Sequence, residues 1–174
     1  DAIWESLAIT KERDFTYPAS HGSDLYRRSL YTFWRRTVAP ANMFDTANRR
    51  TCTVRASRTS TPLHALTTLN DATWVEASRV LAQQVMLAHD TTLAQLTAAF
   101  RLVLSRSPGD DELATLTSAL ERQAELYQAD PELAAALLAV GESPRDESLA
   151  PSDHAALTAV CLAILNLDEA LTRE

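Results

Sequence analysis

Glycine is scarce in this chain. It stands at only three of the 174 positions, Gly22, Gly109 and Gly141. Turn-dense β folds, Gly-rich phosphate loops and dinucleotide-binding fingerprints need more glycine, because they depend on backbone conformations or close approaches that other side chains prevent. Apolar residues instead recur at steps of three and four, which is typical of amphipathic helices. The sequence therefore predicts an all-α fold, an irregular bundle of about seven helices, in a single helical domain over residues 1–174.

Capping residues and prolines mark where these helices begin and end. Thr61 followed by Pro62 predicts the start of a helix over residues 62–70, and Asp130 followed by Pro131 repeats the device. The other boundaries are each predicted from a residue or a short turn. In the first part of the chain these signals predict a helix over residues 3–8, a helix over 25–37 that is capped by Ser23 or Asp24, and a left-handed helix end at Asn70. In the middle they predict a helix from Asp71 to about 89, a helix that is capped by Asp90 or Thr91 and ends ahead of the 107–110 turn, and a helix from Asp110 to 128. Toward the end they predict a helix end at Gly141 and a cap at Ser152 for the last helix.

The same periodicity predicts which face of each helix is buried. The predicted core positions are Tyr26, Leu30, Phe33, Trp34 and Thr37; Trp74, Ser78, Leu81, Val85 and Ala88; Leu93, Leu96, Phe100, Val103 and Leu104; Leu113, Leu116, Leu120 and Tyr127; and Leu157, Val160, Cys161, Ile164 and Leu165. No apolar run approaches the ~20 residues that span a bilayer, so a membrane-embedded chain is not expected.

The charge is distributed unevenly along the chain. The net charge is −7, yet residues 25–62 hold eight arginines, no lysine and the single acid Asp45. Residues 107–174 hold fourteen acids against three arginines. Arginine forks suit carboxylate, sulfate and phosphate groups. Two interpretations stay open: the arginines pair internally with the acidic half, or they form a docking surface for an anionic partner.

Residues 40–60 show no helical period and predict one long ordered loop, which in a compact domain is often functional. Asp45 is isolated among positive charges, so we expect it to accept a hydrogen bond from an arginine of its own segment. The predicted binding residues lie in and just after this loop: Asp45, Arg49, Arg50, Arg55, Arg58, Thr61, His64 and Asp71.

No catalytic motif appears in the sequence. The four histidines form no HExxH-type pair, and no CxxC, GxSxG or P-loop is present, so we name no catalytic residue and no metal ligand. The two cysteines, Cys52 and Cys161, are expected to be a loop thiol and a core thiol, with a disulfide between them as the alternative. An acidic chain without a recognition motif does not suggest nucleic-acid binding.

Several runs resemble a planctomycete-specific domain of unknown function. They begin with residues 24–37 (DLYRRSLYTFWRRT) and 52–71 (CTVRASRTSTPLHALTTLND), followed by 99–106 (AFRLVLSR) and 162–174 (LAILNLDEALTRE). The chain departs from the family at His64, where glutamine is usual, at Arg50, where an acid is usual, and at Ala170, where an aromatic is usual. The first departure weakens a catalytic role for position 64.

The resemblance implies a setting more than a reaction. Such domains form the C-terminal part of large bacterial proteins with a cytochrome c module near the N-terminus. This chain then corresponds to a fragment with no cofactor of its own, and haem is expected elsewhere in the full protein. The implied location is the bacterial cell envelope, the periplasm or outside the cell.

Three functions follow as hypotheses. The first is a non-catalytic interaction domain whose Arg-rich loop binds an anionic partner, which is another domain of the same protein, a protein complex or an acidic glycan. The second is an enzyme domain acting on sulfated polysaccharide, with Asp45, His64 and Asp71 as acid–base groups. The third is a structural dock for the haem module in electron transfer. An enzyme needs a pocket of convergent polar groups, whereas a dock needs an exposed surface of apolar residues and arginine.

Overall fold

The computed structural model describes residues 20–27 and 62–171 of the chain, and within the second range it leaves out the side chains of Leu63 and His64. The chain divides into two units, residues 1–59 and 60–174, and each is considered by itself. The single domain predicted over 1–174 stays a prediction.

In the first unit the described segment is a short 3₁₀ helix, η1 (Gly22–Tyr26). Arg27 forms an ion pair with Asp24, and the backbone at Arg27 is extended. The prediction that Ser23 or Asp24 caps a helix starting at Leu25 is therefore wrong. Gly22 has a φ of 59° and begins a tight 3₁₀ turn that includes both expected caps, and the extended Arg27 ends that turn.

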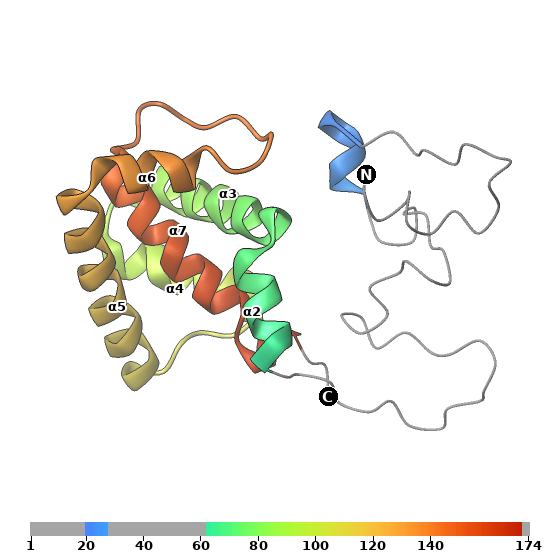
Figure 1. Cartoon of the computed structure of the whole chain (residues 1–174). Coiled ribbons are helices and arrows are strands. Elements are labelled where there is room, and N and C mark those ends of the chain that lie inside the picture. The colour runs from blue at the N-terminus through green and yellow to red at the C-terminus, as the bar shows by residue number, and fades with distance from the viewer. Residues whose placement is uncertain (1–19, 28–61, 172–174) are drawn as a thin grey trace, which may run out of the picture. The chain divides into compact units, whose positions relative to one another are not determined.

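The second unit is all-α, which confirms the predicted fold class (Figure 1). No strand occurs in the part of the chain that the structure describes. The helices are α2 (Pro62–Asn70), α3 (Ala72–Ala88), α4 (Thr92–Leu104), α5 (Asp110–Ala129), α6 (Pro131–Leu138), α7 (Pro151–Leu165) and α8 (Asp168–Leu171).

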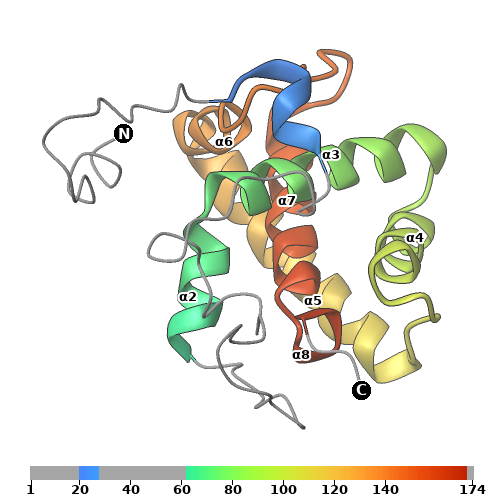
Figure 2. The same ribbon diagram turned by 90° about the vertical axis from the view of Figure 1, so that its right-hand side faces the viewer.

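Helix α7 runs through the middle of this unit. Helices α3, α5 and α6 pack around it, as the two views in Figures 1 and 2 show. Residues 154–165 carry no Asp, Glu, Lys or Arg, and the side chains from His154 to Thr158 are all buried. A helix that is apolar on every side is stable only when other elements surround it. The composition of α7 therefore accounts for its central place.

Two apolar clusters form the core along α7. The larger one joins α7 to α3 and α4 and is made of Ala82, Val85, Leu96, Ala99, Phe100, Leu157, Val160, Cys161 and Ile164. The smaller one joins the start of α7 to α5 and α6 and is made of Tyr127, Ala134, Leu138, Ala155 and Ala156. Leu120 of α5 packs against both clusters and so links them.

Three predicted helix caps are confirmed. The Asp71 carboxylate accepts hydrogen bonds from the backbone N–H groups of Thr73 and Trp74. Thr91 Oγ1 accepts from Ala94 N, and Asp130 Oδ1 accepts from Leu133 N. Each cap satisfies an N–H group that has no partner inside its own helix.

Three other boundary predictions are wrong. Asn70 is not left-handed: it stays within α2, and its side-chain amide donates to Leu66 O at 2.7 Å, so it satisfies a terminal carbonyl without a turn. Ser152 is not the cap of α7, because the helix begins one residue earlier at Pro151, and the Ser152 hydroxyl donates to Tyr127 O at 3.1 Å. Helix α6 ends at Leu138 rather than at Gly141.

The predicted inner faces of α3 and α4 need correction. On α3 the buried residues include Val75, Glu76 and Arg79, while the predicted Ala88 is exposed. The buried charged pair shifts the inner face relative to the apolar stripe. On α4, Leu96 and Phe100 are buried as predicted, but Leu93 is 55% exposed.

Candidate functional site

Most of the sequence-predicted binding residues lie outside the described residues. These are Asp45, Arg49, Arg50, Arg55, Arg58 and Thr61. His64 lies on α2, and its side chain is outside the description as well. The expected 40–60 loop and the hydrogen bond to Asp45 fall in the same stretch. They stay predictions.

Asp71 is the one predicted site residue whose side chain is described. One carboxylate oxygen accepts from Thr73 N at 2.9 Å and from Trp74 N at 3.4 Å. A carboxylate at this position also has a favourable interaction with the helix dipole. Asp71 therefore has a structural role at the start of α3, which explains its presence without any chemistry.

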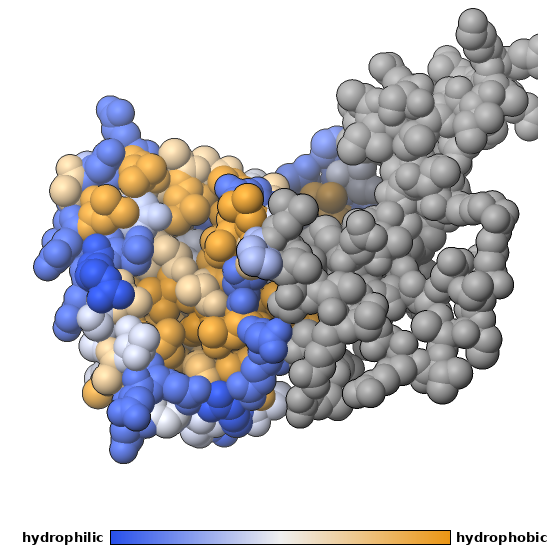
Figure 3. Space-filling view, turned by 60° about the horizontal axis from the view of Figure 1, so that its bottom comes forward, coloured by the Kyte–Doolittle hydropathy of each residue, from blue (hydrophilic) through white to orange (hydrophobic). Residues whose placement is uncertain are grey.

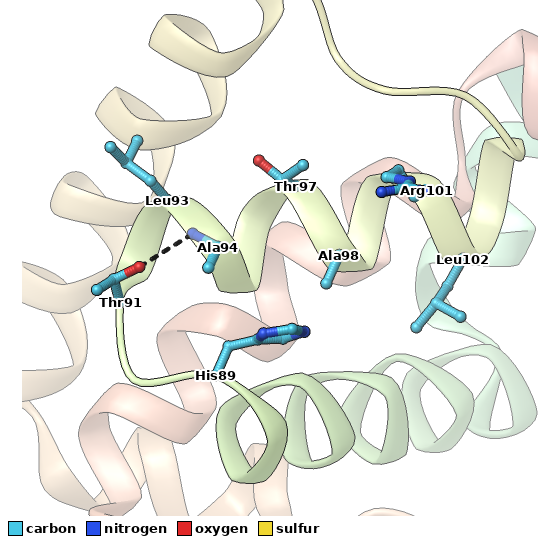
Figure 4. A pocket seen from close by; sticks show the side chains of 8 residues that line it. All are labelled: His89, Thr91, Leu93, Ala94, Thr97, Ala98, Arg101 and Leu102. Atoms are coloured by element: carbon cyan, nitrogen blue, oxygen red, sulfur yellow. Dashed lines mark hydrogen bonds between the residues drawn. The ribbon is translucent and has the colours of Figure 1, made fainter.

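Among the described residues, an open groove of about 760 Å³ lies along α4 (Figure 4). His89, at the end of α3, lies below the helix, and Leu102 points toward that side. The remaining lining comes from the turn into α4 and from α4 itself: Thr91, Leu93, Ala94, Thr97, Ala98 and Arg101.

The groove combines exposed apolar side chains with an exposed arginine. Leu93 is 55% exposed and Leu102 is 64% exposed, the largest exposed fraction of any large apolar residue in the described part of the chain. Arg101 is exposed, and no hydrogen bond or ion pair of its guanidinium occurs within the described part of the chain. Exposed apolar side chains beside arginine are typical of protein contact surfaces rather than of pockets for acid–base chemistry.

The sequence of α4 contains a signal for this groove beyond the apolar periodicity. Helix α4 has its core stripe at Leu96, Ala99 and Phe100, yet it carries further apolar residues on the opposite side. The spacing of apolar residues also predicts Leu93 as a core position. A helix that is apolar on more than its buried side has a face left for a partner.

Apolar residues gather on one face of the second unit. Figure 3 shows them in the middle of that face, with hydrophilic residues along its left and lower edges. Over the whole described part, the exposed leucines also include Leu66 on α2, Leu87 on α3 and Leu133 on α6. Single exposed leucines are ordinary. The α4 groove differs because its leucines flank one continuous hollow.

A pair of buried charged side chains, Glu76 and Arg79, lies between α3 and the loop before α7. The Glu76 carboxylate accepts from the backbone N–H groups of Glu142 and Ser143, and Arg79 Nη2 donates to Ser143 O at 2.7 Å. Arg79 is 1% exposed and lies 3.9 Å from Glu76. These contacts hold the loop onto α3. Burial of a charged pair is tolerated only with such hydrogen bonds.

His154 of α7 is fully buried beside this cluster. Its Nε2 lies 3.0 Å from Arg79 O, so the ring donates to that carbonyl when it is neutral. Burial lowers the pKa of His154, and the nearby Arg145 and Arg79 charges lower it further. The ring is therefore neutral at neutral pH and joins α7 to α3. The sequence placed His154 in a first helical turn but gave no sign of its burial.

An exposed ion-pair network ties the end of α4 to α5 and α8. Arg106 makes two hydrogen bonds to the Glu112 carboxylate and two to that of Glu169, all between 2.7 and 2.8 Å. Glu112 also accepts from Gly109 N at 2.7 Å. Hydrogen bonds from Arg106 and Gly109 lower the pKa of Glu112 to about 2. Because Arg106 binds both carboxylates through two hydrogen bonds each, it fixes the ends of α5 and α8 beside the end of α4, and the network has a structural role.

Two expectations about ligands and thiols can be set against the described residues. They contain no group of three or more side chains that would hold a metal ion. Cys161 is a free thiol in the core, which agrees with the prediction of a core thiol. Burial raises the pKa of Cys161 to about 12, so the thiol is unreactive at neutral pH.

No helix among the described residues is both long and apolar enough to cross a bilayer.

The comparisons with known proteins identify the family. The sequence-family model described as PSD1, protein of unknown function (DUF1553), matches residues 5–120. Because this stretch is about two thirds of the chain, the chain belongs to this family of unknown function. No curated protein and no solved structure matches the chain. The resemblance to a domain of unknown function is thus confirmed.

Proposed function

We propose that this chain is a non-catalytic interaction domain. The observation that supports the proposal best is the open groove on α4, with its exposed leucines and its exposed Arg101. Burial of such side chains against a partner removes apolar surface from water, at roughly 25 cal/mol per Å². The chain's own core does not use this face.

The proposed setting is a multidomain bacterial envelope protein that also carries a cytochrome c module. This setting is supported by the resemblance of residues 24–37 and 52–71 alone. In this proposal the Arg-rich stretch 25–62 binds an anionic partner, because eight arginines against one acid give that stretch a strong positive charge. In this proposal the groove and the arginines each bind a partner.

A site-specific cross-linking experiment tests the proposal. A photo-reactive residue replaces Leu93 in the groove, and a matched control replaces Leu133 of α6, which is 43% exposed. Both variants are made in the full-length protein in its bacterial host. We expect a covalent adduct with one protein at position 93 and none at position 133. The absence of an adduct at position 93, or equal adducts at both positions, would contradict a docking role for the groove.

A further inference from the structure

The polar layer between α3, the loop before α7 and α7 contains buried nitrogen atoms without a hydrogen-bond partner. Within the described part of the chain they are Arg79 Nε and Nη1, Arg145 Nε and His154 Nδ1. Arg79 is 1% exposed, and His154 is fully buried. Buried polar atoms in folded proteins almost always have a partner, which is another protein group, a water molecule or an ion. The layer therefore offers a place for a bound ligand.

The contacts between α3 and the loop bring the two arginines together. Arg79 Nη2 donates to Ser143 O at 2.7 Å, and one turn later on α3 the Gln83 side-chain carbonyl accepts from Asp146 N at 2.9 Å. Arg145 lies between these two anchored residues of the loop. Its position along the chain therefore places it against the same turn of α3.

The His154 ring meets this turn of α3 from the side of α7. Its Nε2 lies 3.0 Å from Arg79 O, a carbonyl that points along α3 toward Gln83. Burial lowers the pKa of the ring, the charges of Arg145 and Arg79 lower it further, and the charge of Asp146 raises it. These charged side chains therefore lie close to the ring.

The protonation state of His154 decides what the layer can bind. In the neutral ring Nε2 donates to Arg79 O, so Nδ1 accepts hydrogen bonds while the arginine nitrogens donate them. A water molecule satisfies both kinds of atom, because it accepts and donates. In the protonated ring Nδ1 also becomes a donor. An anion accepts hydrogen bonds and donates none, so it matches only the protonated layer.

The charges of the layer lead to the same ligand. Arg79 lies 3.9 Å from Glu76, and Arg145 is followed by Asp146 in the loop, so two positive charges stand beside two negative ones. Protonation of His154 adds a positive charge that this set does not compensate. Buried charge is costly unless it is paired. One monovalent anion restores the balance.

Other titratable groups on the helices around the start of α7 leave this balance unchanged. Tyr127 of α5 stays neutral, because burial raises its pKa. Asp153 on α7 and Glu132 on α6 are exposed, so water screens their charges.

We propose that the polar layer binds one small monovalent anion, such as chloride, when His154 is protonated, and water when His154 is neutral. This inference does not rest on the α4 groove or on the proposed interaction function. Arg145 is half-buried in the loop that covers the layer, so the ion can enter beside its side chain. Proton and anion then each raise the affinity of the protein for the other.

Acid unfolding of the 174-residue chain in two sodium salts tests this linkage. Circular dichroism follows unfolding from about pH 7.5 to about pH 3, in about 0.2 M chloride or in the same concentration of isethionate, a larger anion, so that screening is equal. The midpoint of acid unfolding should lie about 0.3 pH unit or more lower in chloride, because the ion binds only the protonated folded state.

Two variants assign the difference between the salts to this layer. His154→Gln keeps a donor for Arg79 O but takes up no proton, and Arg145→Gln removes a positive charge and a donor. Both should lose most of the difference. Arg122→Gln on α5 is the matched control and should keep it, since Arg122 is exposed and donates to Ser118 Oγ.

Two results would overturn the anion site. One is a wild-type midpoint that is the same in both salts, in which case the layer binds water at every pH. The other is a full difference between the salts in His154→Gln. If Arg145→Gln does not fold at pH 7.5, His154→Gln decides the question, because glutamine preserves the hydrogen bond to α3.

Discussion

Gly141 shows how one residue allows a whole loop to dock. Its φ is 91°, a conformation that residues with a side chain rarely adopt. A Cβ atom built there would lie 2.3 Å from Glu76 Cδ, the carboxyl carbon of the side chain that binds the following two amides. The sequence predicts Gly141 as the end of a helix, but its structural role is this close approach to a buried carboxylate.

Replacing this glycine should therefore be costly. Gly141→Ala should lower the free energy of unfolding by about 2 kcal/mol or more, because it combines a strained φ with a clash against a buried side chain. Gly109→Ala is the matched control, since its φ is −74° and its new Cβ would lie 3.6 Å from Glu112 Oε2, an ordinary contact. Urea denaturation measures both. Equal losses in the two variants would show that Gly141 is not needed for the contact.

At the scale of single elements, sequence signals worked where they act locally. The caps Asp71, Thr91 and Asp130 were predictable because each satisfies N–H groups two or three residues away. Apolar periodicity likewise placed α5 and α7 correctly. The failures, such as Ser152, arose where a side chain prefers a distant partner, here the carbonyl of Tyr127 in another helix.

Asp71 was predicted as a binding residue, and its cap geometry makes a distinct prediction. Asp71→Ala should lower the free energy of unfolding by about 1 kcal/mol, the usual cost of losing an N-cap. Asp71→Ser should restore most of that stability, since serine also caps well. Thermal unfolding compares the three proteins. A loss that serine does not recover would indicate that the carboxylate itself is needed, as a binding or acid–base role requires.

The α4 groove could not be predicted from the sequence of that helix alone. Nothing in the spacing of Leu93 distinguishes an exposed position from a core position, because it falls on the edge of the predicted stripe. Only the packing of α3 and α7 against Leu96 and Phe100 decides which side of α4 remains uncovered. A contact surface of this kind follows from the arrangement of several helices, so one helix cannot reveal it.

At the scale of the whole unit, stability depends on a charged layer inside an otherwise apolar bundle. Glu76 and Arg79 are buried, and His154 joins α7 to the backbone of α3 beside them. Simple periodicity assigns charged residues to the solvent side, so this layer was not predictable. It makes the free energy of unfolding depend on pH, because the buried His154 ring must take up a charge when it is protonated.

The direction of that pH dependence follows from the lowered pKa of His154. In the unfolded chain histidine takes up its proton near pH 6.5, whereas in the folded protein it does so only at lower pH. The unfolded state therefore binds more protons as the pH falls below about 7, and the free energy of unfolding should decrease there. Above that range both states are neutral, and His154 adds no pH dependence. Protonation in the folded state would place a third positive charge near Arg79 and Arg145.

Urea denaturation at intervals between about pH 7.5 and pH 5.5 tests this dependence. His154→Gln should reduce the slope of stability against pH, because glutamine keeps a donor for Arg79 O but does not titrate. The matched control is Thr158→Val on the same helix, which also removes a buried polar group but does not titrate, and which should leave the slope as in the wild type. If both variants keep the wild-type slope, the acid sensitivity belongs to other groups and the buried layer does not control it. If only His154→Gln flattens the slope, one imidazole couples the central helix to the protonation state of the whole unit.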